Sequence, residues 1–453
     1  MLSMWSLWAS RLLVADETAD IVAKDGRKVL IKSWSHPAVP VYRFMFCAIL
    51  VEWAWGCSIY VWNRNRVNYH FIMELRASST SGRYHYQTVF ENAINGTIVL
   101  LFNFMLFVKI VQGELPFHRY LPGGLVPVLA LPYLFVHFFL PWKNSSHTLI
   151  PAIVATIGAP FLDVSFFASF VGDWLVSLVR VGADMLYTGC YVGTGAFLID
   201  AKHVKSQRET VDACVASEVY VRVALPLVLA LPLFFRMMQN YRRYTDTRQR
   251  WPHMYNAFKY ALSLMVVVFA VFHPDSIALR SFYDRAWVAA YLVSTLYSFW
   301  WDLRMDWGLL DEPGRDGENM FPLRDRLMYN SRYYYYVAIV LDFFGRFVWT
   351  LTLIPVMRLG PFGTDQFVMS FRNYFGVIEI LRRTMWAFFR CENEHLNNTF
   401  GYRRIKMVPM HFDSSRKLPD RPPTKGIFVI VELALLFVVV VGLSYASFTT
   451  RGV

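Results

Sequence analysis

The sequence has few charged residues for its length. Asp, Glu, Lys and Arg make up 17% of its 453 residues, while 55% of the residues are hydrophobic. An ordinary globular protein carries about 25% charged residues. The composition therefore argues against two or three water-soluble domains and is typical of a membrane protein.

Cysteine is also scarce, and its spacing fits no familiar site. The cysteines form an odd set without CxxC spacing, and most of them lie in or beside apolar segments. They are Cys47, Cys57, Cys190, Cys214 and Cys391. We therefore expect neither a disulfide scaffold nor a zinc site.

Motifs of soluble enzymes are missing too. The sequence contains no P-loop, no GxSxG, no HExxH and no DHHC-type cysteine motif. Glu392 to His395 carries side chains that can bind metals, but the spacing matches no known ligand set, and we interpret it as a helix end. We expect a protein that is not an enzyme and holds no cofactor. The remaining enzyme alternative, a membrane-embedded glycosyltransferase, lacks an acidic motif on a sizeable luminal loop.

Basic residues outnumber acidic ones. There are 45 Lys and Arg against 33 Asp and Glu, which gives a formal net charge of +12. No block of like charges stands apart as a nucleic-acid-binding tail, so we expect no nucleic-acid partner. In a membrane protein such a surplus first sets the orientation of the loops, and second can line an anion path.

Long apolar segments predict many transmembrane helices. A helix needs about 20 apolar residues to cross a bilayer. Ten such segments occur, at 41–62, 91–112, 122–141, 148–170, 175–199, 218–238, 256–273, 284–301, 333–357 and 427–447. An eleventh, 366–390, carries Glu379, Arg382 and Arg383 in its second half. The sequence thus predicts an all-α polytopic membrane protein with 10 to 11 transmembrane helices.

Loop charge favours a crossing by 366–390. If the N-terminus is cytoplasmic and all segments cross, the cytoplasmic side collects roughly 22 Lys and Arg and the far side roughly 12. The bias largely vanishes if this segment does not cross. We therefore expect a luminal or extracellular C-terminus. Residues 1–40 then form a cytoplasmic segment that begins with an interfacial helix on membrane lipids, 41–405 the main transmembrane domain, and 406–453 a basic loop with an extra span.

Some charges lie inside the apolar segments, where each costs at least ~2.5 kcal/mol unless it is partnered. Arg346 lies near the middle of 333–357, with Asp342 one turn before it and Trp349 three residues after it. One interpretation is that Asp342 and Arg346 only neutralise each other. The other is that Arg346 offers its guanidinium group to an oxyanion while Trp349 narrows the path beside it.

The polar segment 366–390 has a similar pattern. Glu379 precedes Arg382 and Arg383 by three and four residues, so on a helix one carboxylate can orient both guanidinium groups. The alternative is an amphipathic helix at the membrane surface, with its arginines at lipid phosphates.

Five further residues complete the candidate site. Lys259 and Tyr260 begin one apolar segment, Asp302 and Asp306 stand one turn apart at the end of another, and Asp173 lies at a junction. Taken alone, the first four are consistent with an interfacial position, and Asp173 with a helix N-cap.

Together these residues balance in charge. The cations Lys259, Arg346, Arg382 and Arg383 face the acids Asp173, Asp302, Asp306 and Glu379. Each arginine can keep a carboxylate partner while the site is empty. A doubly charged tetrahedral oxyanion can then compete for the guanidinium groups, which suit it bidentately. This is an anion-translocation arrangement, and it needs no catalytic nucleophile.

At these residues the sequence resembles the EXS-domain family. This family includes the xenotropic and polytropic retrovirus receptor of animals, the plant root-to-shoot phosphate exporters and the yeast ER-retention-defective protein. The matching stretches are YVWNRNRVNYHFIMEL (60–75), LPLFFRMMQNYRRYTDTRQRWPHMYNAFKY (231–260), STLYSFWWDLRMDWGLL (294–310), RYYYYVAIVLDFFGRFVWT (332–350) and EILRRTMWAFFRCENEHLNN (379–398).

The resemblance implies efflux of inorganic phosphate through an EXS-type transport domain. Trp349 matches the aromatic gate of the family. The positions matching its phosphate path are Asp173, Lys259, Tyr260, Asp302, Asp306, Arg346, Glu379, Arg382 and Arg383. Where the family often has polar residues after Asp173, this sequence has Val176 and Val179, which bears on anion preference or rate. Ser177 and Arg180 are nearby polar alternatives.

Two larger differences concern context. Animal and plant exporters carry a regulatory SPX domain before the first span, and since residues 1–40 precede it here we expect that regulation to be absent. The layout without this domain is most similar to the yeast protein, which implies the Golgi, where glycosylation releases phosphate that returns to the cytosol. Alternatives are export at the plasma membrane or the ER, or an interaction protein that binds Golgi glycosyltransferases or coat adaptors. A homodimer follows from the resemblance only.

Overall fold

The described part of the chain is mostly helical. The computed structural model describes residues 36–75, 86–111, 115, 122–139, 146–199, 204–272, 282–310, 323–324, 326–348 and 374–399. These residues contain no strand, which confirms the predicted all-α class. The chain divides into two compact units. Unit 1 comprises Met1–Gly56, His85–His147 and Leu178–Val228, and unit 2 comprises Cys57–Tyr84, Thr148–Ser177 and Leu229–Val453.

Three of the described helices are long and apolar enough to cross a membrane. They are α2 (Val39–Arg64), α4 (Tyr86–Val111) and the stretch Tyr220–Thr247, which joins the π-turn η6 (Tyr220–Ala224) to α10 (Leu225–Thr247). A fourth span results if α7 (Phe166–Ser177) and α8 (Val179–Gly193) are counted as one broken span. The count of 10 to 11 spans stays a prediction, and 427–447 and the N-terminal helix lie outside the described residues.

Two predicted segment boundaries were wrong. The segment 148–170 is not one helix, because α6 (Ser146–Ile157) ends before Gly158 and Pro160, and α7 begins only at Phe166. Proline lacks the N–H that a continuing helix would use. The polar segment is also shifted, since α15 runs from Phe375 to Thr399 and so includes the ENEH stretch.

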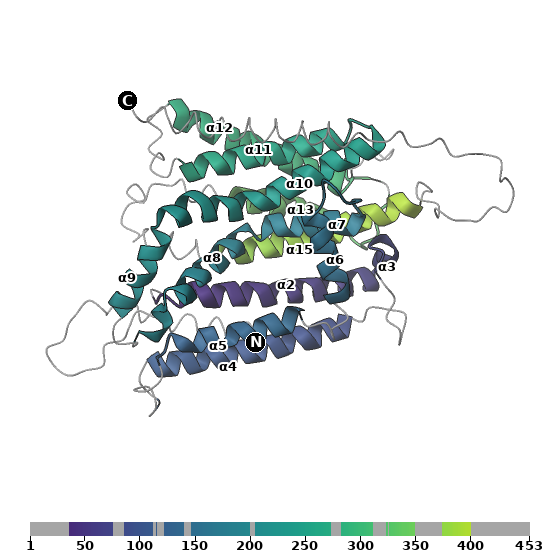
Figure 1. Ribbon diagram of the computed structural model, residues 1–453. Helices are drawn as coiled ribbons and strands as arrows, with labels where there is room; N and C mark the ends of the chain where they lie inside the picture. The colour runs from purple at the N-terminus through teal and green to yellow at the C-terminus, as the bar shows by residue number, and fades with distance from the viewer. Residues whose placement is uncertain are drawn as a thin grey trace, which may run out of the picture. The chain divides into compact units, whose positions relative to one another are not determined.

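Unit 1 is built on helices that pack through aromatic and aliphatic side chains. Helix α5 (Leu125–Phe139) lies beside α4, as Figure 1 shows, and the short 3₁₀-helix η4 (Ala196–Leu198) contacts α5, α8 and α9 (Val204–Val215). The core of the unit includes Tyr42, Phe107 and Tyr191. The hydroxyl of Tyr42 donates to Asn103 Oδ1 at 2.7 Å, so this buried phenol is satisfied.

Unit 1 also contains one ion pair and one histidine–carboxylate contact, both largely shielded from solvent. Arg43 donates to both carboxylate oxygens of Asp184, each at 2.5 Å. His137 Nε2 lies 2.7 Å from Glu52 Oε2. Paired charges of this kind are tolerated inside helical bundles because each group keeps its hydrogen bonds.

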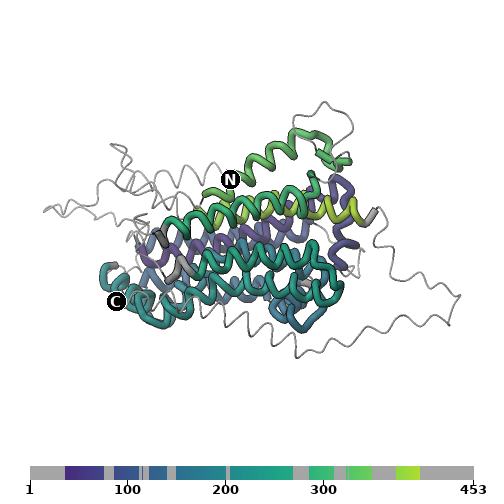
Figure 2. Tube along the Cα trace, turned by 90° about the horizontal axis from the view of Figure 1, so that it is seen from above, coloured from purple at the N-terminus to yellow at the C-terminus, as the bar shows by residue number. Residues whose placement is uncertain are grey.

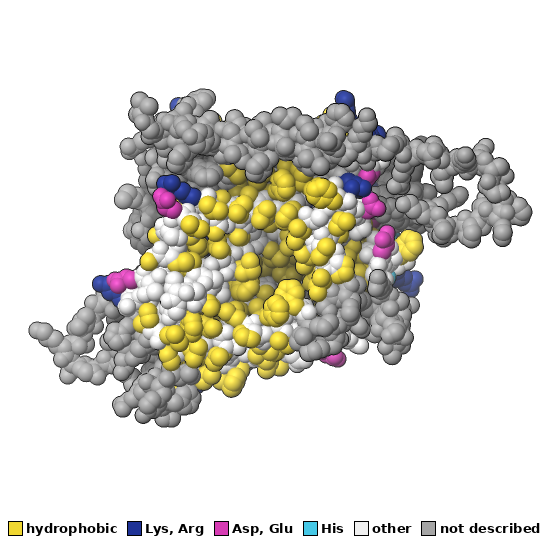
Figure 3. All heavy atoms as spheres, viewed as in Figure 1, with side chains coloured by type: hydrophobic (Ala, Val, Ile, Leu, Met, Phe, Trp, Pro, Cys, Tyr) yellow, Lys and Arg dark blue, Asp and Glu magenta, His cyan; other side chains and the backbone are white. Residues whose placement is uncertain are grey.

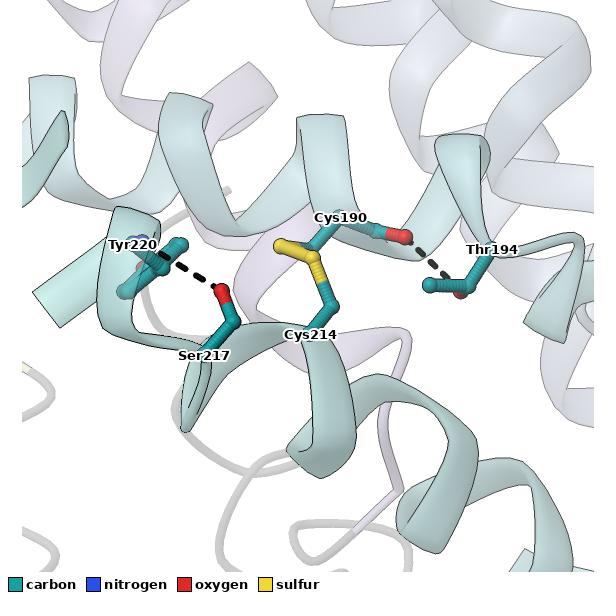
Figure 4. The surroundings of a disulfide bond; sticks show 5 residues. All are labelled: Cys190, Thr194, Cys214, Ser217 and Tyr220. Carbon is teal, nitrogen blue, oxygen red and sulfur yellow. Dashed lines mark hydrogen bonds between the residues drawn. A yellow bond between two sulfur atoms is a disulfide. The ribbon is translucent and has the colours of Figure 1, made fainter.

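A disulfide joins α8 and α9, contrary to the expectation from the cysteine count. Cys190 and Cys214 are bonded, and Figure 4 shows the two sulfur atoms between these helices. Nearby, the hydroxyl of Thr194 donates to the Cys190 carbonyl, and Ser217 Oγ accepts from the Tyr220 amide. The sequence alone could not pair them, because five scattered cysteines show no spacing that selects these two.

Unit 2 contains the remaining helices. Its main elements are the end of α10, α11 (His253–Phe272), α12 (Phe282–Trp301), the π-helix η7 (Asp302–Asp306), α13 (Arg332–Phe347) and α15. Helices α11 and α12 lie side by side (Figure 1), and the same helices are seen from above in Figure 2. Helix α15 contacts α7, α13, η7 and the short helix α3 (Tyr69–Ile72). It is therefore the helix around which this unit is organised.

The outer surface of the described helices is apolar. Figure 3 shows hydrophobic side chains across the visible face, with charged side chains near its margins. Exposed hydrophobic side chains of the described helices include Phe102, Phe135, Phe258, Phe344 and Leu381. In a water-soluble protein so much exposed apolar surface would favour aggregation, whereas a membrane protein presents it to lipid.

The disulfide gives a first prediction. Its two cysteines are 24 residues apart in sequence, and closing a loop of this size stabilises a protein by about 3 kcal/mol. We expect Cys190→Ser and Cys214→Ser each to lower the thermal unfolding temperature in detergent, and mass spectrometry of the natural chain to find the linked peptides. Cys57→Ser, at an exposed free cysteine, is the matched control. Equal stability of all three variants and an absent cross-link would contradict the disulfide.

Candidate anion-binding site

Helix α15 supplies two adjacent arginines to the interior of unit 2. Arg382 donates to both carboxylate oxygens of Glu379, at 2.8 and 2.6 Å, as the spacing of three residues predicts. Its third donor reaches Asp342 Oδ1 on α13 at 2.7 Å. Arg382 and Arg383 are both buried, so the alternative that these arginines lie at lipid phosphates is wrong.

Helix α13 contributes the next link. Arg346 Nε donates to Asp342 Oδ2 at 3.1 Å, and its terminal nitrogen bonds Asp302 on η7. Asp342 therefore accepts from both Arg346 and Arg382 and is fully buried. It is more than the local neutralising partner considered from the sequence, because it joins α13 to α15.

A second buried ion pair lies between α7 and α10. Arg236 donates to the two carboxylate oxygens of Asp173 at 2.8 and 3.0 Å, and the hydroxyl of Tyr260 donates to the same carboxylate at 2.5 Å. Gly172 makes this approach possible, because a Cβ there would lie 2.5 Å from Arg236 Cδ. Asp173 sits inside α7, so the N-cap alternative is wrong. Arg236 was missed from the sequence.

Two buried cations have no direct carboxylate partner among the described residues. Lys259 Nζ lies 4.6 Å from the ring centre of Tyr260 and 5.3 Å from that of Trp301. Arg383 donates to Ser177 Oγ at 2.6 Å, and its guanidinium carbon is 4.4 Å from the Trp386 ring centre. Aromatic faces attract cations more weakly than carboxylates do. Among the described cations of the site, an anion that bound these two would displace no carboxylate.

Ser177, one of the two polar alternatives named from the sequence, lies beside the arginine pair. Its hydroxyl accepts from Arg383 and donates to Glu379 Oε1 at 2.7 Å, which links the serine to both ends of the arginine pair. The neighbouring Val176 is packed with the apolar side chains of α10 and α11.

The π-helix η7 places two further carboxylates. Asp302 is buried and paired with Arg346, which contradicts an interfacial position for it. Asp306 accepts from the indole N–H of Trp386 at 3.3 Å, and its nearest ion-pair partner is Arg390 Nε at 3.7 Å. Short π-helical turns occur often at functional sites, since the extra residue redirects the side chains around it.

A polar network fixes the end of α15 to the chain that follows η7. Glu392 is fully buried, and its carboxylate accepts from the Met328 amide at 2.7 Å and the Tyr335 hydroxyl at 2.5 Å. Arg324 forms an ion pair with it at 3.0 Å. The ENEH stretch is thus a helix end, as predicted, but Glu392 belongs to the protein interior.

Asn393 extends this network to η7. Its amide nitrogen donates to the carbonyls of Met305 and Asp306, at 3.2 and 3.1 Å, and its oxygen accepts from Arg324 at 2.9 Å. Gly308 follows η7 with φ +60 and leaves room for the Asn393 side chain. The backbone that carries Asp306 is therefore held in place by α15.

The structure gathers the predicted residues in one unit. All nine predicted path residues lie in unit 2, but Trp349 lies outside the described residues. The cations Arg236, Lys259, Arg346, Arg382, Arg383 and Arg390 balance the acids Asp173, Asp302, Asp306, Asp342, Glu379 and Glu394. The described residues contain no group of His, Cys, Asp and Glu able to hold a metal ion. The passage of an anion along these residues stays a prediction.

The Glu392 network gives a second prediction. Arg324→Ala leaves a buried carboxylate without its cation, and breaking such a pair costs about 3–5 kcal/mol. We expect a lower thermal unfolding temperature for the purified protein in detergent. Arg326→Ala is the matched control, because Arg326 is exposed and accepts from Arg324 through its backbone carbonyl, which the substitution retains. Equal unfolding temperatures for the two variants would disprove a stabilising role for the Arg324–Glu392 pair.

Comparison with known proteins identifies relatives. The sequence profile of the EXS family matches residues 38–396. The chain is 31% identical over 376 residues to SPX and EXS domain-containing protein 1 of Dictyostelium discoideum, which covers 80% of this chain and 38% of that protein. It is 31% identical over 404 residues to Solute carrier family 53 member 1 of Homo sapiens, covering 84% of this chain and 54% of that protein.

A third relative gives the same picture. The Xenotropic and polytropic retrovirus receptor 1 homolog of Xenopus laevis is 31% identical over 395 residues, covering 84% of this chain and 54% of that protein. The chain thus spans about half, or less, of the length of these curated relatives.

Proposed function

The chain belongs to the EXS family, and from this membership and its two buried cations without carboxylate partners we propose that it moves inorganic phosphate across a membrane. The cations are Lys259 and Arg383. They carry the proposal because every other arginine described in the site already binds a carboxylate. The name of the human relative, a solute carrier, supports transport rather than catalysis.

Phosphate suits this pair of cations. Its oxygens accept charge-assisted hydrogen bonds, and an arginine offers two parallel donors to a tetrahedral oxyanion. Lys259 and Arg383 are both buried, where the lower dielectric strengthens such bonds. Both also lie within electrostatic range of Asp173 and Asp302. We therefore place the anion near these two cations.

The paired arginines have a supporting role in this proposal. Asp342 and Glu379 hold Arg382 in one orientation, and Asp302 and Asp342 hold Arg346. The carboxylates keep the empty site close to neutral, which limits the cost of burying it. They also weaken the net attraction for the anion, so that phosphate can leave again. Trp349 remains the proposed gate.

Flux in proteoliposomes tests the proposal. Lys259→Met and Arg383→Met each remove a buried charge with little change in volume. A hydrogen bond to a charged group is worth about 1.5–3 kcal/mol, so we expect each variant to lose about tenfold or more in phosphate flux. Lys205→Met, at an exposed lysine of α9, is the control and should keep natural flux. Natural flux in both site variants, with unfolding temperatures unchanged, would refute the assigned site.

We also propose a Golgi membrane as the location, with transport from lumen to cytosol after glycosylation. The disulfide supports a membrane of the secretory pathway, because disulfides persist where one side of the membrane is oxidising. In the predicted topology 200–217 is luminal, on the same side as this bond. A homodimer, and binding of glycosyltransferases or coat adaptors, remain further predictions.

Localisation gives the matching prediction. A tagged natural chain should colocalise with Golgi markers, and a membrane-impermeant thiol reagent should label Cys214 only after reduction and permeabilisation of the Golgi membrane. Tagged Lys259→Met is the control, because a transport defect should not change the membrane in which the protein is found. Signal at the plasma membrane would favour the export alternative. Capture of glycosyltransferase tails that is unaffected by Lys259→Met would favour the interaction alternative.

A further inference from the structure

Among the described carboxylates of the site, Asp306 has the longest contacts with hydrogen-bond donors and cations. Asp173 and Glu379 each receive two arginine donors at 3.0 Å or less. Asp342 accepts from two arginines, at 2.7 and 3.1 Å. Among the residues that the structure describes, Asp306 contacts only the Trp386 indole at 3.3 Å and Arg390 at 3.7 Å. Its oxygens therefore keep most of their capacity to accept a hydrogen bond.

Lys259, a cation without a carboxylate partner among the described residues, lies near the element that carries Asp306. Lys259 lies against the start of this element, since its Nζ is 5.3 Å from the ring centre of Trp301, the residue immediately before η7. The charged atoms of Lys259 and Asp306 nevertheless form no ion pair within 4.0 Å among the described residues. The side chain of Asp306 is 15% exposed. A ligand that carries both an anionic oxygen and a hydroxyl group can contact the two residues together.

Tetrahedral anions differ in this respect. At neutral pH inorganic phosphate retains a proton on at least one oxygen, so it can donate a hydrogen bond to a carboxylate while its other oxygens accept from an ammonium group. Sulfate is fully ionised and has only acceptor oxygens. Beside a carboxylate it offers no proton to accept and adds like-charge repulsion, which specific sites use to reject a wrong partner.

We propose that Asp306 is a specificity-determining residue, which accepts the proton-bearing oxygen of a partly protonated tetrahedral oxyanion and excludes fully ionised ones such as sulfate. The inference rests on the proposed phosphate transport. Lys259 binds the anionic oxygens in this arrangement, and the two residues together recognise both the charge and the proton of the substrate.

The surrounding structure holds the carboxylate ready for this role. Asn393 binds the backbone carbonyl of Asp306, and the indole N–H of Trp386 holds one carboxylate oxygen. The Trp307 amide closes the π-turn on the Asp302 carbonyl at 2.8 Å. Because backbone and side chain are both held, Asp306 cannot readily turn away when an anion without a proton arrives. This rigidity is what lets one acid discriminate between anions.

Asp306→Asn tests the proposal. The carboxamide has the same shape, but it removes the negative charge and can donate an N–H to an acceptor oxygen. We expect sulfate flux relative to phosphate flux in proteoliposomes to rise about tenfold or more, which corresponds to about 1.4 kcal/mol. Asp163→Asn is the matched control, because Asp163 is exposed and pairs with Arg242 at a distance of 3.0 Å. An unchanged sulfate-to-phosphate ratio in folded Asp306→Asn would overturn the assignment.

Competition in the natural chain needs no variant. Arsenate, which also keeps a proton at neutral pH, should inhibit phosphate flux, whereas sulfate at the same concentration should not. Equal inhibition by the two anions would overturn the selectivity proposal while leaving phosphate transport intact. Absence of any phosphate flux in the natural chain would instead overturn the proposed function itself.

Discussion

The cost of burying a charge governs the interior of unit 2. A guanidinium or carboxylate group that leaves water without a partner loses several kcal/mol, and α15 alone brings Arg382 and Arg383 into the protein interior, with the partly exposed Glu379 beside them. The cost is offset by sharing. Asp342 serves two arginines, and Arg382 serves Glu379 and Asp342. The shared groups come from different helices, so the same bonds that neutralise the charges also fix α13, η7 and α15 against one another.

The proposed site is defined by the two buried cations that have no carboxylate partner among the described residues. Lys259 and Arg383 are as deeply buried as the paired groups, yet aromatic rings and the Ser177 hydroxyl hold them in place of carboxylates. Such contacts position a cation without cancelling its charge. In the proposed function, the anion therefore binds two oriented cations without displacing a carboxylate.

Local spacing predicted part of this site and could not predict the rest. The pairs Glu379–Arg382 and Asp342–Arg346 follow from helical periodicity, and both form as expected. Arg236 and Asp173 lie 63 residues apart, and only the packing of α10 against Gly172 brings them together. The same holds for the Cys190–Cys214 bond. The break between α6 and α7 was signalled by Gly158 and Pro160, but segment hydropathy, which averages over such residues, does not register them.

A site for passage must also release what it binds. Six cations without acids would hold a dianion too tightly to let it leave, whereas complete pairing would leave nothing to attract it. The observed arrangement lies between these limits, because the acids reduce the field of the arginines and Asp306 remains available to the substrate itself. An acid that accepts the proton of its ligand contributes attraction, and one that meets a fully ionised ligand contributes repulsion. The carboxylates of this site can therefore lower affinity and raise selectivity at the same time.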